Sequence, residues 1–130
     1  HTSLLDDVPL ALPELMRAAK LQKRAARVGF DWPSLDGVIE KITEEAQELA
    51  EAAESQDADA IEDEMGDLLF AVTNLSRKLG VDPELALRRT NSKFTRRFKH
   101  IEESAKSEAR NIKNMSLDEM EALWQAAKKL

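Results

Sequence analysis

The sequence contains no cysteine and no tyrosine, and it has only four glycines and four prolines in 130 residues. Without cysteine, neither a disulfide framework nor a zinc site built on thiolates can form. So few glycines and prolines leave little turn chemistry for an all-β fold. Apolar residues make up 42% and charged residues 34% of the chain, a mixture typical of amphipathic helices. We therefore expect an all-α protein.

Long apolar runs and an excess of positive charge are also missing. No stretch approaches the ~20 apolar residues of a membrane span, and no signal-peptide pattern begins the chain, so we expect a cytoplasmic protein without a membrane partner. Nineteen basic and twenty-five acidic residues give a net charge of −6. This charge argues against a general nucleic-acid binder, because phosphate contacts need a positive field.

Helical periodicity begins after the first eleven residues. Residues 1–11 show no useful period and are interpreted as a tail or linker, whereas residues 12–130 are long enough for one domain with a real core. Start and stop signals predict five helices. We expect them from Pro13 to a cap at Gly29, from Ser34 or Asp36 to Ser55, from Asp57 or Asp59 to about Leu79, from Asp82-Pro83 to about Ala109, and from Ser116 onward.

The apolar stripes of the three longest helices define the expected core. The predicted stripes are Ile39, Ile42, Ala46, Leu49 and Ala53, then Ile61, Met65, Leu68, Val72, Leu75 and Leu79, then Leu87, Phe94, Phe98, Ile101 and Ala105. The run from Leu68 to Val72 is apolar on nearly all sides, which is typical of a central helix. In so small a domain a second copy of the chain is the simplest cover, so we predict a homodimer. Asn91 falls within the last stripe, where it is either a structural hydrogen-bonder or a ligand contact.

Carboxylates gather on the second and third predicted helices. Lys41, Glu45 and Glu48 lie along one strip beside the apolar face, with Glu44 next to it, and Glu64-x-x-Asp67 repeats the pattern on the next helix. Two unit charges about 5 Å apart cost roughly 3 kcal/mol at an effective dielectric near 20. Such a cluster needs a cation or bound protons, and oxygen ligands favour Mg²⁺ first and Mn²⁺ second. The alternative is an ordinary solvated acidic face.

Other metals fit poorly, and the neighbouring charges suggest a phosphate ester. Only His1 and His100 are present, and neither follows a candidate glutamate by three residues, which disfavours di-iron and zinc sites. Lys93 and Arg97 share one helical face and could hold phosphate oxygens, although this basic segment could also merely balance nearby acids. The chain has neither a glycine-rich phosphate loop nor an evident nucleophile with its base, which leaves metal-assisted attack by water.

These residues resemble a known family. Glu44-Glu45-Ala46-Gln47-Glu48 and Glu64-Met65-Gly66-Asp67 are similar to the E-E-x-x-E…E-x-x-D signature of MazG-type nucleoside triphosphate pyrophosphohydrolases. Further similar segments, in order, extend the likeness over roughly residues 12–128: 28–33, 66–70, 91–98 and 115–124. The lead-in from Leu12 to Pro33 resembles that of the second domain in tandem MazG proteins. The chain would then be such a C-terminal half or a single-domain version.

The resemblance implies a four-helix core completed by tight homodimerisation, and Mg²⁺-dependent cleavage of nucleoside triphosphates to monophosphate and pyrophosphate. It assigns the metal to Glu45, Glu48, Glu64 and Asp67. It gives Glu44 a supporting role behind the ligands or the role of orienting the attacking water. It assigns the phosphates to Lys41, Lys93, Arg96 and Arg97, and the nucleotide to Trp124 and Lys128. For Trp124 the alternative is core packing at a helix end.

Two non-catalytic interpretations stay open. The chain could be a helical dimerisation module whose acids form a solvated face, or a nucleotide-sensing domain that binds without turnover. The first alternative predicts no effect of Mg²⁺ on thermal stability. The second predicts nucleotide binding without products. Base and sugar preference, the number of metal ions, and the choice between attack at the α- and β-phosphorus do not follow from the residues.

Overall fold

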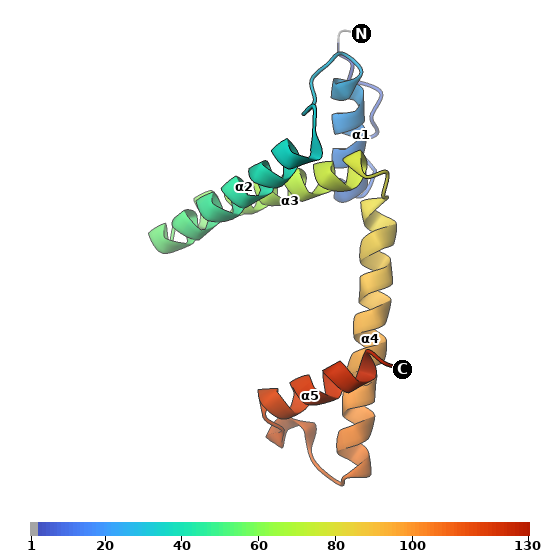
Figure 1. The fold of residues 1–130 in the computed structure, drawn as a ribbon. Coiled ribbons are helices and arrows are strands. Elements are labelled where there is room, and N and C mark those ends of the chain that lie inside the picture. Colours follow the sequence, from blue (N-terminus) through green and yellow to red (C-terminus); the bar gives the residue numbers. More distant parts are fainter. Residues whose placement is uncertain (1–2) are drawn as a thin grey trace. The chain divides into compact units, whose positions relative to one another are not determined.

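A computed structural model describes residues 3–130, which contain helices and no strand (Figure 1). The elements in chain order are α1 (Glu14–Ala26), α2 (Leu35–Ser55), α3 (Ala58–Lys78), α4 (Pro83–Ser107), the 3₁₀ turn η1 (Ile112–Asn114) and α5 (Leu117–Ala127). The chain divides into two compact units, His1–Glu84 and Leu85–Leu130. The all-α prediction is confirmed, and the first two residues of the expected tail lie outside the described residues. Within residues 3–130 no helix is long and apolar enough to cross a bilayer.

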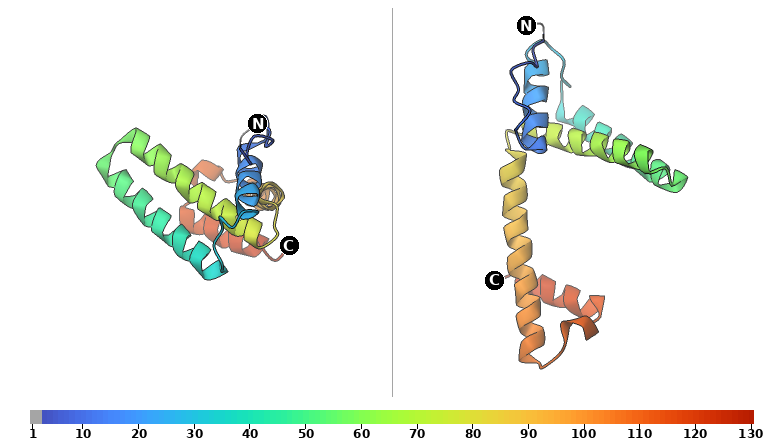
Figure 2. Two further views of the ribbon diagram at one scale, coloured as in Figure 1. Left: turned by 90° about the horizontal axis from the view of Figure 1, so that it is seen from above. Right: turned by 180° about the vertical axis from the view of Figure 1, so that it is seen from behind.

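In the first unit α2 and α3 lie side by side and antiparallel, and α1 packs across one end of α3 (Figures 1 and 2). The connection between α2 and α3 is short because Gln56 ends α2 with a left-handed φ of 60° and Asp57 starts α3. The Asp57 carboxylate accepts hydrogen bonds from the backbone nitrogens of Asp59 at 3.0 Å and Ala60 at 3.3 Å. Asp57 is therefore the N-cap, one of the two caps that the sequence predicts.

The loop after α1 is shaped by Gly29. Its φ of +89° lies in the left-handed region that favours glycine, and the backbone nitrogen of Phe30 donates to the carbonyl oxygen of Ala25 at 3.2 Å. This pattern closes a helix with a Schellman-type turn. The helix itself ends at Ala26, so Gly29 reverses the chain just beyond it. The reversal directs Phe30, Asp31 and Trp32 back along the first unit.

The buried side of α2 differs from the predicted stripe. Val38 and Glu45 are buried at 1% and 5% exposure, whereas Ile39 is 50% exposed and Ala46 and Ala53 are also exposed. The stripe prediction was therefore wrong for Ile39, Ala46 and Ala53 in the single chain, whereas its other members, Ile42 and Leu49, are half-buried. Periodicity alone assigns buried positions to the apolar residues and not to a glutamate.

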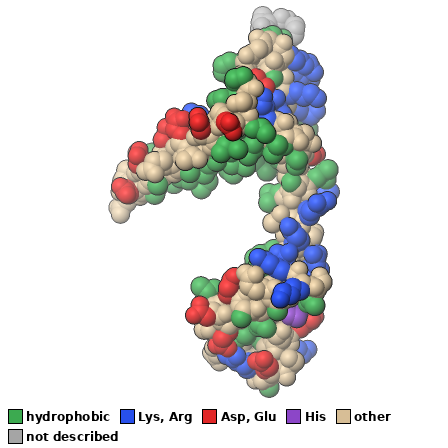
Figure 3. All heavy atoms as spheres, in the orientation of Figure 1, with side chains coloured by type: hydrophobic (Ala, Val, Ile, Leu, Met, Phe, Trp, Pro, Cys, Tyr) green, Lys and Arg blue, Asp and Glu red, His purple; other side chains and the backbone are tan. Residues whose placement is uncertain are grey.

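Hydrophobic side chains remain uncovered on the α2–α3 pair, where they gather along one side (Figure 3). On α3 the exposed large hydrophobic residues are Met65, Leu69, Phe70, Val72 and Leu79. Met65, Val72 and Leu79 belong to the predicted core stripe, so a single chain does not bury that stripe. The predicted homodimer would supply the cover, and it stays a prediction.

The second unit packs α5 against α4 near the C-terminal part of α4. Ile101 and Ala105 of α4 are buried together with Met115 and Ala127. The capping box at Ser116 is confirmed: Glu119 N donates to Ser116 Oγ at 3.1 Å, and Ser116 N donates to Glu119 Oε1 at 3.2 Å. The guanidinium of Arg110 hydrogen-bonds Glu119 and, with the Ser116 backbone, lowers the pKa of Glu119 to about 2.

The earlier part of α4 is less covered than its apolar pattern suggests. Leu87 and Phe94 are exposed, and Asn91 is exposed as well. The expectation that Asn91 lies within a buried face was therefore wrong for the single chain. The buried α4 residues, Ile101 and Ala105, lie about two and three helical turns beyond Phe94.

Candidate metal centre and adjoining cavity

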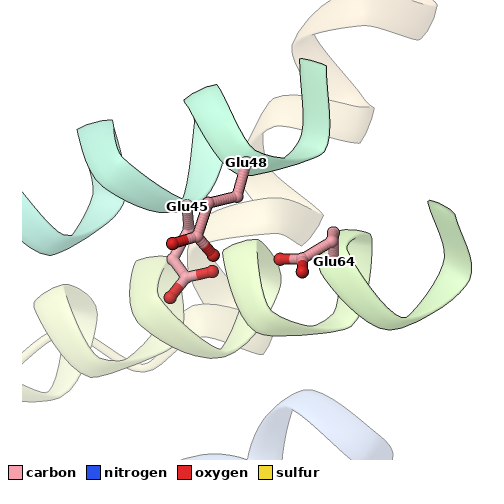
Figure 4. A group of neighbouring side chains, drawn as sticks. All are labelled: Glu45, Glu48 and Glu64. Carbon is pink, nitrogen blue, oxygen red and sulfur yellow. The ribbon is translucent and has the colours of Figure 1, made fainter. Parts of the chain in front are cut away.

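Three glutamates from two helices converge in the first unit. Glu45 and Glu48 project from adjacent turns of α2, and Glu64 projects toward them from α3 (Figure 4). One carboxylate oxygen from each lies within 4.8 Å of the others. The i, i+3 spacing on α2 and the short α2–α3 connection produce this convergence. Three of the four predicted metal ligands are thus brought to one place.

The fourth predicted ligand, Asp67, belongs to an adjoining group. Asp63, Glu64 and Asp67 have ligand oxygens within 4.8 Å of one another, so Glu64 is shared by both groups. Asp63, which is exposed, was missed in the sequence because it falls outside the Glu64-x-x-Asp67 spacing. Its separation of four residues from Asp67 was the available signal, since positions four apart are neighbours on a helix.

Two buried oxygens of this cluster lack hydrogen-bond partners. They are Oε2 of Glu45 and Oε2 of Glu64, and neither has a partner among the described residues. Glu45 is buried, and its other oxygen lies 3.0 Å from Nζ of Lys41. A buried carboxylate oxygen without a partner is costly unless something binds there. Hard divalent cations prefer this oxygen-only donor set, so the residues present fit a magnesium-type ion.

The pKa values of the acids reflect crowding of negative charge. The pKa of Glu48 is raised by the charge of Glu45, by partial burial and by Glu64. Burial raises the pKa of Asp67, and Asp63 and Glu45 raise it further, while Lys41 opposes them. The hydrogen bond to Glu45 raises the pKa of Lys41 despite some burial. The cluster therefore favours whatever neutralises it, either protons or a cation.

Lys41 and Glu44 lie at the edge of the cluster. Lys41 Nζ is 3.8 Å from Glu44 Oε1 and closer to Glu45, so the lysine expected to contact phosphate is paired with two acids. Glu44 is exposed. Its carboxylate thus stands beside the buried acids and open to solvent, which suits a group that would interact with water rather than hold the metal.

A cavity of about 520 Å³ adjoins the acids within the first unit. Lys41, Glu45 and Asp67 line it together with residues of α1, of the loop after α1 and of α3. Most of its wall is apolar, and a volume in this range suits a small organic ligand. Phe30 and Trp32 form part of this wall while staying exposed.

The loop that carries Trp32 is fastened to the end of α3. Asp31 accepts a hydrogen bond from Arg77 at 2.7 Å, and Lys78 Nζ donates to the carbonyl oxygen of Trp32 at 2.7 Å. Arg77, which is itself mostly buried, also donates to Asn74 Oδ1 at 2.8 Å through the same nitrogen. The two cations hold the pKa of Asp31 below its usual range, against the effect of burial. One side of the cavity is therefore fixed by charge-assisted hydrogen bonds.

The remaining predicted substrate contacts belong to the second unit. Arg97 lies over the Trp124 ring, with Cζ 5.4 Å from the ring centroid, and the rings of Phe94 and Trp124 are 5.5 Å apart. Trp124 thus packs on α4, as its alternative interpretation expects, while a half-buried ring can still offer a face to a ligand. Arg96 lines an open hollow on α4 with Asn91, Lys93 is half-buried, and Lys128 is exposed.

The fold and the cluster together define a class: an all-helical domain with carboxylates from two antiparallel helices arranged for a hard divalent cation. Comparison with known proteins narrows it. Residues 34–102, which include the whole cluster, match the MazG nucleotide pyrophosphohydrolase domain. Because this match covers more than half of the chain, the chain belongs to that family.

Individual relatives agree with the family match. The chain is 46% identical over 129 residues to a nucleoside triphosphate pyrophosphohydrolase of Escherichia coli K12, covering 98% of this chain and 49% of the relative. It is 40% identical over 127 residues to the nucleoside triphosphate pyrophosphohydrolase/pyrophosphatase MazG of Thermotoga maritima, with the same coverages of 98% and 49%. It is also 48% identical over 129 residues to the protein YabN of Bacillus subtilis, of which it covers 26%. The chain thus spans half or less of the length of these curated relatives.

Proposed function

We propose that the domain hydrolyses nucleoside triphosphates, including deoxynucleotides, to nucleoside monophosphate and pyrophosphate. The reaction depends on Mg²⁺, which Mn²⁺ can replace, and it removes unwanted nucleotides from the cytoplasmic pool. The observation that supports it most is the convergence of Glu45, Glu48 and Glu64 with two buried, unpartnered oxygens. Family membership gives this cluster its chemical context, because relatives of the chain carry the name of that activity.

The acids would hold the ion, and the neighbouring groups would act on water and phosphate. Glu45, Glu48, Glu64 and Asp67 supply the ligands, and the bound ion would neutralise the phosphate oxygens and act as a Lewis acid. Glu44, exposed beside them, would orient the attacking water. Lys41 is close enough to the cluster to exchange its pairing with Glu44 for a phosphate oxygen. The chain offers further cationic and aromatic groups to the nucleotide: Lys93, Arg96, Arg97, Trp124 and Lys128.

Two proposed features depend on a second copy of the chain. The exposed apolar residues of α3 and α4 would form the dimer interface, and a four-helix core would be completed there. Asn91, exposed in the single chain, would contact the substrate.

Pyrophosphate release from nucleoside triphosphates tests the function. We expect activity with Mg²⁺ and a loss of at least about 100-fold in Glu64→Gln and Asp67→Asn, because each substitution removes a charged ligand while keeping the side-chain shape. Glu62→Gln is the matched control, since Glu62 lies on the same helix, is exposed and is outside the cluster. Full activity in both ligand variants, with the fold verified by circular dichroism, would contradict the proposal. Binding of nucleotides without any product would favour the sensing alternative.

The role of Glu44 can be separated from that of the ligands. Glu44→Gln should lower kcat strongly while the stabilisation by Mg²⁺ stays close to that of the wild type, because the group would act on water and not on the ion. Loss of the Mg²⁺ effect in Glu44→Gln would instead make Glu44 a ligand.

A further inference from the structure

Besides Glu45, one other residue that lines the cavity has a buried polar atom without a hydrogen-bond partner among the described residues. Gln22 of α1 is 8% exposed, and its Oε1 is buried and has no hydrogen-bond partner among the described residues. Gln22 also lines the cavity, together with Glu45 and Asp67 of the acid cluster. A carbonyl-type oxygen without a partner, on a residue that lines a space of ligand size, is an unused hydrogen-bond acceptor next to that space.

The orientation of the Gln22 amide is fixed by its other end. Nε2 donates to the backbone carbonyl oxygen of Phe70 on α3 at 2.9 Å. A carbonyl oxygen can only accept, so the nitrogen of the amide must face Phe70. Oε1 must then face away from Phe70. This lining residue therefore carries an unused acceptor, and a ligand group that satisfies it has to be a donor.

We propose that the cavity takes the base of the nucleotide, and that Gln22 is a specificity-determining residue whose Oε1 accepts a hydrogen bond from an N–H on the edge of that base. This inference rests on the proposed function, because it places the triphosphate at the acid cluster and the base in the space beside it. The substrate class is then a nucleoside triphosphate whose base offers an N–H donor, which includes the canonical nucleotides and excludes inorganic triphosphate and base analogues without such a donor.

Three features of the cavity suit a base. Its volume of about 520 Å³ and mostly apolar wall accept a flat ring. Trp32 contributes an aromatic side whose position is held by the Lys78 bond to its carbonyl oxygen. It is also held by its approach to α2, where a Cβ added at Gly37 would lie 2.8 Å from Trp32 Cδ1. Lys41, Glu45 and Asp67 line the same cavity and are charged, so the phosphates and a cation would bind on that side of it.

A second amide lies close to Gln22. Asn74 follows Phe70 by one helical turn, so it is next to the carbonyl that holds Gln22. Asn74 is buried, lines the cavity, and its Oδ1 accepts hydrogen bonds from Arg77 Nε at 3.1 Å and from a terminal nitrogen of Arg77 at 2.8 Å. With Oδ1 engaged, the donor Nδ2 is the group of Asn74 left for a ligand. Two lining residues thus carry an acceptor and a donor, and both kinds of group are needed to match a base edge, where N–H groups alternate with ring nitrogens or carbonyls.

The test compares bases that differ only in this donor. Two pairs of substrates are used: ATP with purine riboside triphosphate, which lacks the amino group, and CTP with the triphosphate of 2-pyrimidinone riboside, which lacks it too. For the better-used pair, the wild type should show kcat/KM at least about 10-fold higher with the N–H-bearing base, since an unpaired buried acceptor is penalised. Gln22→Leu should reduce this ratio to within about twofold, mainly by lowering kcat/KM for the N–H-bearing base.

Controls keep the substitution interpretable. Gln22→Met repeats the change with a flexible side chain in case Gln22→Leu folds poorly, and Gln47→Leu makes the same chemical change at an exposed position of α2. Hydrolysis of inorganic triphosphate, which has no base, should be equal in wild type and Gln22 variants. Equal use of both members of each pair by the wild type, or an equal loss for both in the variants, would overturn the inference.

The inference can also fail separately from the proposed function. If the wild type hydrolyses ATP and purine riboside triphosphate equally, the proposed hydrolysis is supported and the proposed role of Gln22 in recognising the base is wrong. If no triphosphate is hydrolysed, the proposed function is wrong. The dissociation constants of the two members of each pair are then measured by calorimetry and compared instead of kcat/KM. Equal dissociation constants for both members of each pair would then show that Gln22 Oε1 makes no hydrogen bond to the base.

Discussion

Nζ of Lys41 lies 3.0 Å from Oε1 of Glu45, and Oε2 of the same buried carboxylate has no partner in the described part of the chain. One oxygen of Glu45 is therefore neutralised within its own helix, while the other is left for the acid cluster. A single lysine cannot balance Glu45, Glu48 and Glu64 together. The protein without metal thus holds excess negative charge at this place, and several measurable consequences follow from it.

Neutralising Glu48 should have opposite effects with and without metal. In the metal-free protein Glu48→Gln should raise the melting temperature, because the charge of Glu45 raises the pKa of Glu48 and so disfavours its ionised form. With Mg²⁺, the wild type should gain about 2.7 kcal/mol at a concentration 100 times the dissociation constant, and Glu48→Gln should lose most of that gain. Thermal melts with EDTA and with Mg²⁺ measure both effects.

The control for this experiment is Glu54→Gln. Glu54 lies on α2, is exposed and is outside the acid cluster. It should keep the wild-type gain with Mg²⁺ and show no rise without it. A Glu48→Gln protein that is less stable without metal and still responds fully to Mg²⁺ would show that the crowded acids do not form the site.

The same crowding predicts a pH dependence of the metal-free protein. A raised folded-state pKa contributes stability that is complete below the unfolded pKa and is lost as pH rises through the folded pKa. The free energy of unfolding of the wild type, minus that of Glu48→Gln, should therefore increase as pH falls from 7 to 5. Urea unfolding in EDTA at several pH values measures this difference.

The pH range from 7 to 5 lies above the range in which Glu119 would affect the stability in the opposite direction. The pKa of Glu119 is lowered to about 2 by Arg110 and the Ser116 backbone, so its contribution is lost as pH falls from about 4.5 toward 2. In Mg²⁺ the sign of the Glu48 effect should reverse, because protons compete with the cation for the carboxylates. A difference that does not change between pH 7 and 5 in EDTA would mean that the Glu48 pKa is not raised.

The sequence correctly predicted those features that depend on residues close to one another along the chain. The capping box at Ser116 and the cap at Asp57 each depend on residues within three positions; the first was predicted correctly, and Asp57 is one of the two caps that the sequence offered. The convergence of Glu45, Glu48 and Glu64 followed from helical spacing and a short connection. These features need no knowledge of how distant segments pack.

The features that escaped prediction depend on such packing. The hydrogen bond from Gln22 to Phe70 joins residues 48 positions apart, and no period in the sequence indicates it. The buried line through Val38 and Glu45 was missed because a glutamate on a contact face contradicts the apolar pattern. In both cases a polar group is buried next to the site, and there chemical function outweighs the hydrophobic rule.

Two glycines of the first unit should respond oppositely to a methyl group. A Cβ at Gly37 would lie 2.8 Å from Trp32 Cδ1, so Gly37→Ala should displace Trp32 and cost about 1–3 kcal/mol of stability. A Cβ at Gly66 would meet nothing within 4 Å, and Gly66 is inside α3, so Gly66→Ala should stabilise the fold by about 0.5–1 kcal/mol.

Chemical unfolding of both variants measures the two signs. The displacement of Trp32 is followed by fluorescence in a Trp124→Phe background, which leaves a single tryptophan in the chain. An unchanged Trp32 spectrum in Gly37→Ala would show that the loop adapts without moving the ring. A loss in Gly66→Ala that grows with protein concentration would place a partner chain against this position.

The exposed apolar side of α3 should be the dimer interface. Leu69 is 50% exposed and lies between Met65 and Val72, which are also exposed. A contiguous apolar surface of this kind marks an interaction site in a protein that is otherwise highly charged. We expect the wild type to sediment as a dimer and Leu69→Lys to shift toward monomer, because a buried, unpaired ammonium at the centre of an interface is strongly unfavourable. Leu10→Lys makes the same change at a position that is 81% exposed and should leave the dimer intact.

Sedimentation equilibrium over a range of protein concentrations separates monomer from dimer. A wild type that is monomeric at every concentration, or a Leu69→Lys protein as dimeric as Leu10→Lys, would place the interface elsewhere or remove it.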